Sequence, residues 1–107
     1  MGHDLLQLQD EFVAHLCETQ YSAETVAAYR RDLGLFQEYL SQPGQQLSGS
    51  SLAGYRGWLV KRHASALSTL RRRLSAVRSF LRFVHERGIA ASDLSEAVEL
   101  PPVGAQR

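Results

Sequence analysis

The fold of this 107-residue chain is decided by residues 65–87, SALSTLRRRLSAVRSFLRFVHER. Apolar residues recur along this stretch at steps of three and four, which is the spacing of one buried stripe on a helix. They are Leu67, Leu70, Leu74, Val77, Leu81 and Val84. We therefore predict one long helix, buried along one side, with Ser65 or Ser68 as its cap and Gly88 as its end.

The opposite side of this helix is rich in arginine. At about 100° per residue, four polar side chains share a sector of roughly 60°: Arg71, Ser75, Arg78 and Arg82. Ser68 and Thr69 lie near the start of the same side, whereas Arg73 borders the apolar stripe and is left out. Such a helix packs on its own domain and still offers guanidinium groups to an anionic partner.

The remainder of the chain is predicted to be helical as well. Further helices are expected over residues 4–19, 23–41, 51–63 and, as a short last element, 93–99. Ser22 is a predicted N-cap, and Pro43-Gly44 marks a turn in the loop 41–51. No segment alternates with period two, so the fold class is all-α: a four-helix bundle with a short fifth C-terminal helix. Residues 4–100 form one domain, and residues 101–107 begin a linker.

Cysteine usage and hydropathy indicate the compartment. Cys17 is the only cysteine, so an internal disulfide is impossible; we expect a small core residue and a reducing, cytoplasmic setting. No run of about 18 apolar residues is present, so no membrane contact is expected. The N-terminal residues also lack the features of a signal peptide.

The net charge of +1 conceals a strong asymmetry. Residues 1–55 hold two arginines against seven acids, while residues 56–87 hold nine basic residues against Glu86 alone. A surface helix normally interleaves acids with its arginines, yet no acid lies between Arg56 and Arg82. Concentrated, uncompensated positive charge on a folded segment favours nucleic acid as the partner.

No catalytic constellation is visible in the sequence. The four histidines, His3, His15, His63 and His85, have no metal-ligand spacing, and one cysteine cannot complete a zinc site. The glycines form no phosphate-binding loop. We therefore expect no cofactor, no metal and no enzymatic activity in this chain alone.

Two segments resemble motifs of one protein family. Residues 68–80, STLRRRLSAVRSF, with Ser65 as a leading serine, resemble the S-x-x-T-x-x-R-x-L-S-A-x-R-x-F signature of tyrosine recombinases. Residues 22–33, SAETVAAYRRDL, resemble the S-x-x-T-x-x-x-Y-R-x-D-L segment of the same family, and residues 88–102 are similar to its closing helix and proline-marked exit. The resemblance covers about residues 10–103 and implies the SAM-like core-binding domain of a Xer-type recombinase or phage integrase.

In such proteins this domain is one half of a C-shaped clamp around duplex DNA. The resemblance implies that the second and fourth helices meet the major groove of a recombination half-site, and that a catalytic domain closes over the opposite side. The family's catalytic arginines, histidines and nucleophilic tyrosine have no counterparts here, which is expected of an excised domain or a truncated product. Ser92-Asp93 also stands where family members often have Asn-Pro. Whole family members act as tetramers, whereas this chain alone is expected to be monomeric.

Charge, periodicity and resemblance together define a predicted contact set for DNA. Its members are Thr25, Arg30, Arg31, Ser68, Thr69, Arg71, Arg72, Ser75, Arg78 and Arg82. Small hydroxyls would bind phosphates, and arginines would supply charge and guanine contacts. Tyr29 also matches a motif position, but it lies on the apolar stripe of its helix, so we expect a buried ring with an outward hydroxyl.

Two other functions are compatible with the same residues. A helical interaction domain would use the arginine side against an acidic protein partner. An enzyme in its own right would require the gene to end near Arg107.

Overall fold

The computed structural model describes residues 5–19, 21–64, 66–89 and 93–101. These ranges contain helices and connecting turns, without a strand. The elements are α1 (Leu5–Glu18), α2 (Ala23–Leu40), α3 (Gly49–Ala53), α4 (Tyr55–Arg62), α5 (Leu67–Glu86) and the 3-10 helix η1 (Leu94–Ala97). The predicted all-α class is confirmed.

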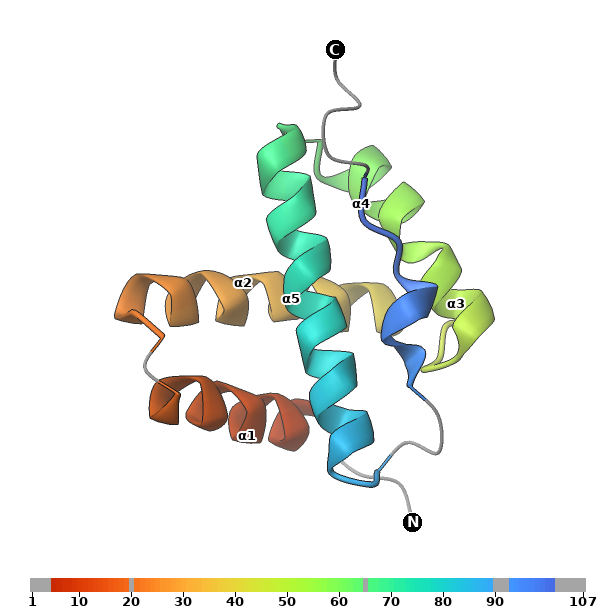
Figure 1. Ribbon diagram of the computed structural model, residues 1–107. Helices are drawn as coiled ribbons and strands as arrows, with labels where there is room; N and C mark the ends of the chain where they lie inside the picture. The colour runs from red at the N-terminus through yellow and green to blue at the C-terminus, as the bar shows by residue number, and fades with distance from the viewer. Residues whose placement is uncertain (1–4, 20, 65, 90–92, 102–107) are drawn as a thin grey trace.

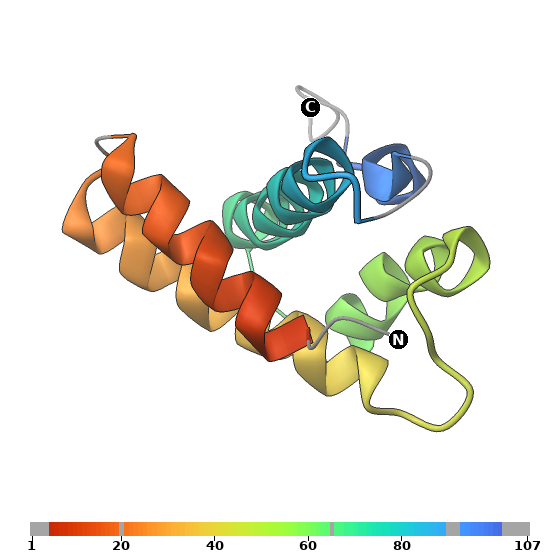
Figure 2. The same ribbon diagram turned by 90° about the horizontal axis from the view of Figure 1, so that it is seen from below.

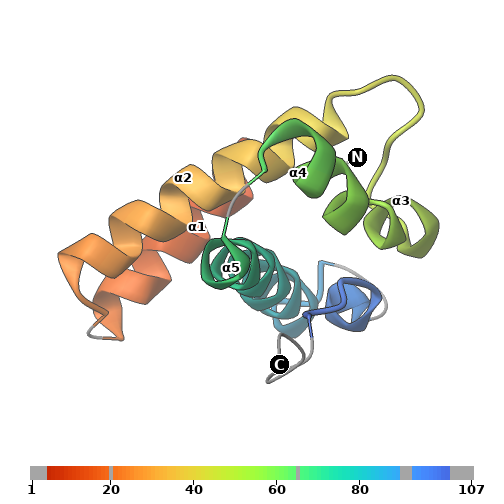
Figure 3. The ribbon, with the colours of Figure 1, turned by 90° about the horizontal axis from the view of Figure 1, so that it is seen from above.

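Helix α5 occupies the centre of the molecule. It crosses α1 and α2, which lie side by side, and it packs against α4 and η1 on its other flank (Figures 1 and 2). Viewed from above, α5 is seen nearly end-on between these two groups of helices (Figure 3). The helix that carries the arginines is therefore also the element around which the core is assembled.

The buried surface of α5 is wider than one stripe. Leu74, Val77, Leu81 and Val84 are buried as predicted, and Ala76, Phe80 and Phe83 are buried beside them. The predicted stripe is wrong at its start, since Leu67 is 37% exposed. A central helix is covered from several directions in its middle, while its first turn extends beyond the neighbouring elements.

The ends of the long helices follow the local sequence. Ser22 caps α2 by accepting a hydrogen bond from the Thr25 amide at 3.1 Å, as predicted. Gly88 follows α5 with a φ of 75°, and the Ile89 amide donates to the Val84 carbonyl at 3.2 Å. This is a Schellman ending, which glycine permits because it adopts positive φ without steric cost. The N-cap of α5 is Ala66 without a capping side chain; Ser68 lies inside the helix, and Ser65 lies outside the described residues.

The single helix predicted over residues 51–63 is wrong, because it is divided into α3 and α4 at Gly54. The Tyr39 hydroxyl donates to the Ser51 carbonyl at 2.5 Å and lies close to the Gly54 backbone. A tertiary hydrogen bond thus competes for a carbonyl of the last turn of α3. Ser48 caps α3 by accepting from the Ser51 amide at 3.4 Å, so the helix begins two residues before the predicted start.

Two further expectations need correction. Cys17 is exposed rather than part of the core, since it lies one residue beyond buried Leu16 and is rotated away from it. The last element is a single 3-10 turn, capped by the Asp93 side chain, rather than a helix over residues 93–99. Of the expected linker, Pro101 is buried, and residues 102–107 lie outside the described residues.

Candidate nucleic-acid interface

A partly buried salt bridge joins α2 to α5 where the two helices cross. Arg72 donates from Nε to Oδ2 of Asp32 at 3.0 Å and from Nη2 to Oδ1 at 2.8 Å. Asp32 is 1% exposed, whereas the Arg72 side chain remains 40% exposed. The carboxylate raises the pKa of the Arg72 guanidinium by hydrogen bonding, which keeps the group charged. The expectation that the arginines of α5 lack an acidic partner is therefore wrong for Arg72.

Other arginines of α5 are engaged by backbone carbonyls. Arg71 Nη1 donates to the carbonyl of Pro101, so this side chain connects α5 to the C-terminal segment. Arg73 Nη1 donates to the His63 carbonyl at 3.2 Å, across the connection between α4 and α5. Arg73, which the sequence analysis left out of the contact set, therefore has a partner within its own domain.

Arg78 is half-buried and lies beside the C-terminal segment. It lines a groove together with Glu96, Glu99 and Leu100, and its Nε is buried without a hydrogen-bond partner among the residues that the structure describes. Glu96 of η1 and Glu99, which follows η1, therefore border one side of the arginine-rich surface.

The remaining members of the contact set are more open to solvent. Arg30, Arg31, Ser68 and Arg82 are exposed, while Thr25, Thr69 and Ser75 are half-buried. The Thr25 hydroxyl accepts a hydrogen bond from Ser22 at 2.9 Å, so it participates in the cap of α2. The structure thus does not bring all ten residues together on one free face. Exposed cations on α2 and α5 flank a crossing at which Arg72 is already paired.

Tyr29 lies on α2 near this crossing and is half-buried against the core, as predicted for its ring. Burial raises the pKa of its hydroxyl, and the nearby groups of Tyr21 and Asp32 raise it further. The rings of Tyr21 and Tyr29 meet edge to face with centroids 6.2 Å apart. This contact therefore packs Tyr21, which precedes α2, against the first half of that helix.

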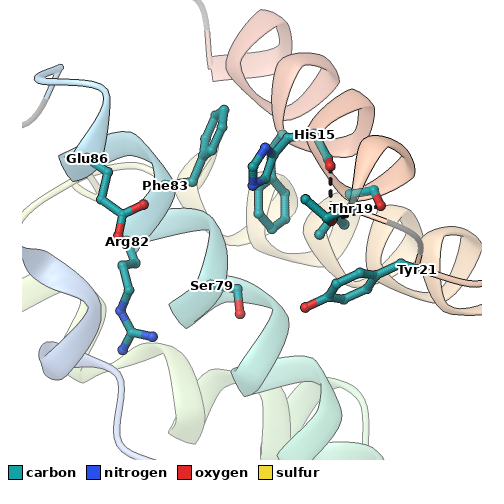
Figure 4. Close-up of a pocket in the computed structure, with 9 residues that line it drawn as sticks. His15, Thr19, Tyr21, Ser79, Arg82, Phe83 and Glu86 are labelled. Carbon is teal, nitrogen blue, oxygen red and sulfur yellow. Dashed lines mark hydrogen bonds between the residues drawn. The ribbon is translucent and has the colours of Figure 1, made fainter.

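A groove of about 250 Å³ lies on the surface between α1 and the second half of α5. Its polar lining comes from His15, Thr19 and Tyr21 on one side and from Ser79, Arg82 and Glu86 of α5 on the other (Figure 4). The Tyr21 and Ser79 hydroxyls point toward the same space, and Thr19 donates to the His15 carbonyl at 3.1 Å. Arg82 therefore stands at the edge of a polar groove rather than on a flat helix surface.

The described part of the chain holds no group of three or more His, Cys, Asp or Glu residues placed to bind a metal ion. It also holds no helix with the length and apolar character needed to cross a membrane.

Sequence reasoning missed Asp32, the residue that organises this surface. The signal was present in the Y-R-x-D-L segment, where an aspartate directly precedes the buried Leu33. A charged residue next to a core position is buried only when it is paired. Its partner, Arg72, lies 40 residues away in the sequence, and no local sequence pattern predicts this pairing.

Comparison with known proteins identifies the family. Residues 10–88, well over half of the chain, match the family model described as phage integrase, N-terminal SAM-like domain. The chain is 34% identical over 101 residues to tyrosine recombinase XerC of Lactobacillus delbrueckii subsp. bulgaricus, covering 89% of this chain and 34% of the relative. It is 38% identical over 102 residues to tyrosine recombinase XerC of Roseiflexus castenholzii, covering 88% and 31%.

A third relative is tyrosine recombinase XerD of Agrobacterium fabrum, which is 28% identical over 105 residues, covering 96% of this chain and 32% of the relative. No solved structure matches the chain. The chain spans about a third of the length of these curated relatives, and the match to the family's N-terminal domain includes none of its catalytic domain. The chain therefore belongs to the phage integrase family, as a member of its N-terminal SAM-like domain.

Proposed function

We propose that this chain binds double-stranded DNA as the N-terminal clamp domain of a site-specific tyrosine recombinase, with α2 and α5 toward the major groove of a half-site. One observation carries the proposal. Five arginines of the predicted contact set form no ion pair with the described residues, although α1, α2 and η1 all carry acids. The five are Arg30, Arg31, Arg71, Arg78 and Arg82. Such uncompensated cations are stabilised by a polyanion.

The proposal also covers the setting in which the domain acts. Catalysis belongs to a separate domain of the parent protein, which assembles as a tetramer on two DNA sites in the cytoplasm and carries out DNA integration or recombination. The chain alone is monomeric. The names of the relatives, tyrosine recombinases XerC and XerD, support this setting.

The salt dependence of DNA binding tests the proposal. If about five phosphates are neutralised, the logarithm of the association constant falls with the logarithm of salt concentration at a slope of about −4 to −5. The measurement is a fluorescence anisotropy titration of a labelled duplex at several salt concentrations. A slope near zero, or no binding at low salt, would overturn the proposal.

A matched pair of variants separates a specific surface from diffuse charge. Arg82 is exposed on α5, and we expect Arg82→Ala to reduce affinity and to make the slope shallower by about 0.9. Arg87 lies at the end of the same helix, where its guanidinium stacks over Phe83 at 4.5 Å and lies 4.0 Å from Glu11. Arg87→Ala is therefore the control, with a smaller effect. Equal effects would indicate diffuse charge alone.

The competing function is capture of an acidic protein partner. Competition between duplex DNA and polyglutamate, at equal concentrations of charge, distinguishes the two classes of ligand. We expect the duplex to displace a labelled duplex at much lower concentration than polyglutamate does. Preference for polyglutamate would favour the protein partner instead.

A further inference from the structure

The pairing of Arg72 with Asp32 leaves a defined part of the guanidinium unused. Arginine carries five N–H groups in one plane. Asp32 accepts two of them, one from Nε and one from Nη2, along one edge of the group. Three N–H groups remain, two on Nη1 and one on Nη2. One from each nitrogen forms a second fork along the adjacent Nη1–Nη2 edge of the group.

Burial determines which edge of Arg72 faces outward. The bonded edge faces Asp32, which is 1% exposed, while the Arg72 side chain is 40% exposed. Because the guanidinium is planar and rigid, its Nη1–Nη2 edge is turned about 120° away from the edge that holds the buried carboxylate. The exposed part of the Arg72 side chain therefore gives the free fork access to solvent at the crossing of α2 and α5, the two helices proposed above to contact DNA.

The carboxylate also changes what this fork can recognise. Arg72 and Asp32 together carry no net charge, so Arg72 contributes little to the counterion release that drives phosphate binding. Two parallel N–H groups on a fixed guanidinium retain their directionality, and they match the O6 and N7 acceptors of guanine in the major groove. Neutralisation weakens a phosphate contact more than a base contact.

Resting on the proposed function, we infer that Asp32 is a positioning residue that fixes Arg72, and that the free fork of Arg72 reads a guanine edge rather than a phosphate. The exposed arginines, such as Arg82, supply the charge. Base recognition is concentrated at Arg72, the arginine of the contact set that a carboxylate fixes with two hydrogen bonds.

The test begins with the intact chain and a randomised duplex pool, from which preferred sequences are selected by repeated binding. Discrimination is then the ratio of affinities for a selected duplex and a scrambled duplex at one salt concentration. For Arg72→Lys we expect this ratio to fall by about five- to 150-fold, the range for one bidentate base contact. The salt slope should stay unchanged, because lysine keeps the charge but cannot hold Asp32 and a base with two separate forks.

For Asp32→Asn we expect affinity and discrimination to change in opposite directions. Removal of the negative charge leaves Arg72 free and uncompensated, so affinity for the scrambled duplex rises and the slope steepens by up to about 0.9, while discrimination falls. Glu38→Gln is the matched control, since it removes one acid from the more exposed pair with Arg62 and should leave discrimination unchanged. Circular dichroism verifies that each variant is folded.

A second measurement uses the unmodified chain. Replacement of guanine by 7-deazaguanine in the selected duplex removes the N7 acceptor and should lower affinity, without changing the salt slope. Three results would each overturn the inference and leave salt-dependent DNA binding intact. They are unchanged affinity for this duplex, a discrimination ratio of one for the wild type, and full discrimination by folded Asp32→Asn and Arg72→Lys. Absence of any DNA binding would instead overturn the proposed function on which it rests.

Discussion

The hydroxyl of Tyr39 occupies the space into which a side chain at Gly54 would extend. A Cβ atom at Gly54 would lie 3.0 Å from this oxygen, which itself donates to the Ser51 carbonyl at 2.5 Å. The Tyr39 ring is packed against Tyr55 and Trp58, with centroids 5.1 and 5.4 Å apart, so it has little freedom to withdraw. The division between α3 and α4 is therefore held by one tyrosine and one glycine.

The effect of Gly54→Ala on the free energy of unfolding should change sign when Tyr39 is replaced by phenylalanine. The φ of Gly54 is −88°, so alanine fits the backbone, but its methyl group meets the Tyr39 hydroxyl. We expect Gly54→Ala to destabilise the wild type by about 1 kcal/mol and to stabilise the Tyr39→Phe background by about 0.4–1 kcal/mol. Urea unfolding of the wild type, the two single variants and the double variant measures this double-mutant cycle. The same sign in both backgrounds would contradict steric conflict as the cause.

The two partners of the α2–α5 salt bridge should respond unequally to removal. Arg72→Met leaves the buried Asp32 carboxylate without its partner, which we expect to cost about 3 kcal/mol. Asp32→Asn leaves Arg72 half-exposed and able to reach water, so about 1 kcal/mol is expected. The free energy of unfolding in urea measures both. A larger loss for Asp32→Asn would argue against this account of burial.

Arg71 should stabilise the C-terminal segment locally. Its guanidinium holds the Pro101 carbonyl, and the segment before Pro101 contains η1, whose last hydrogen bond runs from the Val98 amide to Ser95 at 3.2 Å. We expect Arg71→Ala to speed hydrogen exchange at Val98 by about tenfold, the equivalent of about 1.4 kcal/mol. Amides in the middle of α1 should keep their protection. Arg82→Ala, which removes an exposed arginine from the same helix, should leave Val98 unchanged.

Alkaline pH should unfold the protein through its buried tyrosines. Burial raises the pKa of Tyr29, Tyr39 and Tyr55 above the value of 10.0 that applies in the unfolded chain. Below pH 10 both states keep the phenols protonated, and stability is independent of these groups. Above pH 10 the unfolded state loses protons first, so stability falls as pH rises.

Tyr55→Phe isolates the largest of these effects. The Tyr55 hydroxyl is buried without a hydrogen-bond partner among the described residues, so its removal should cost nothing at pH 7 and stabilise by up to about 1 kcal/mol. The decline in stability above pH 10 should also become shallower. Thermal unfolding monitored by circular dichroism between pH 7 and 11 measures both effects, and an unchanged alkaline slope would contradict the assignment to Tyr55.

The sequence by itself determined the all-helical class, the extent of the two long helices and most of the core side of α5. These depend on local chemistry: the three-and-four spacing of apolar residues, a serine that caps α2 and a glycine that ends α5 at positive φ. The charge asymmetry was equally readable, because composition does not depend on how the chain folds.

Only the tertiary structure decided which arginines are free. Arg71, Arg72 and Arg73 are consecutive in sequence, yet they contact the C-terminal segment, α2 and the α4–α5 connection respectively. A helical wheel gives the direction of each side chain but not the element that meets it, and the three partners lie 10 to 40 residues away along the chain. The split at Gly54 has the same origin, because Tyr39 reaches its carbonyl partner only after α2 has packed on α4. Long-range contacts of this kind distinguish an arginine that is held by the fold from one that remains available to a partner.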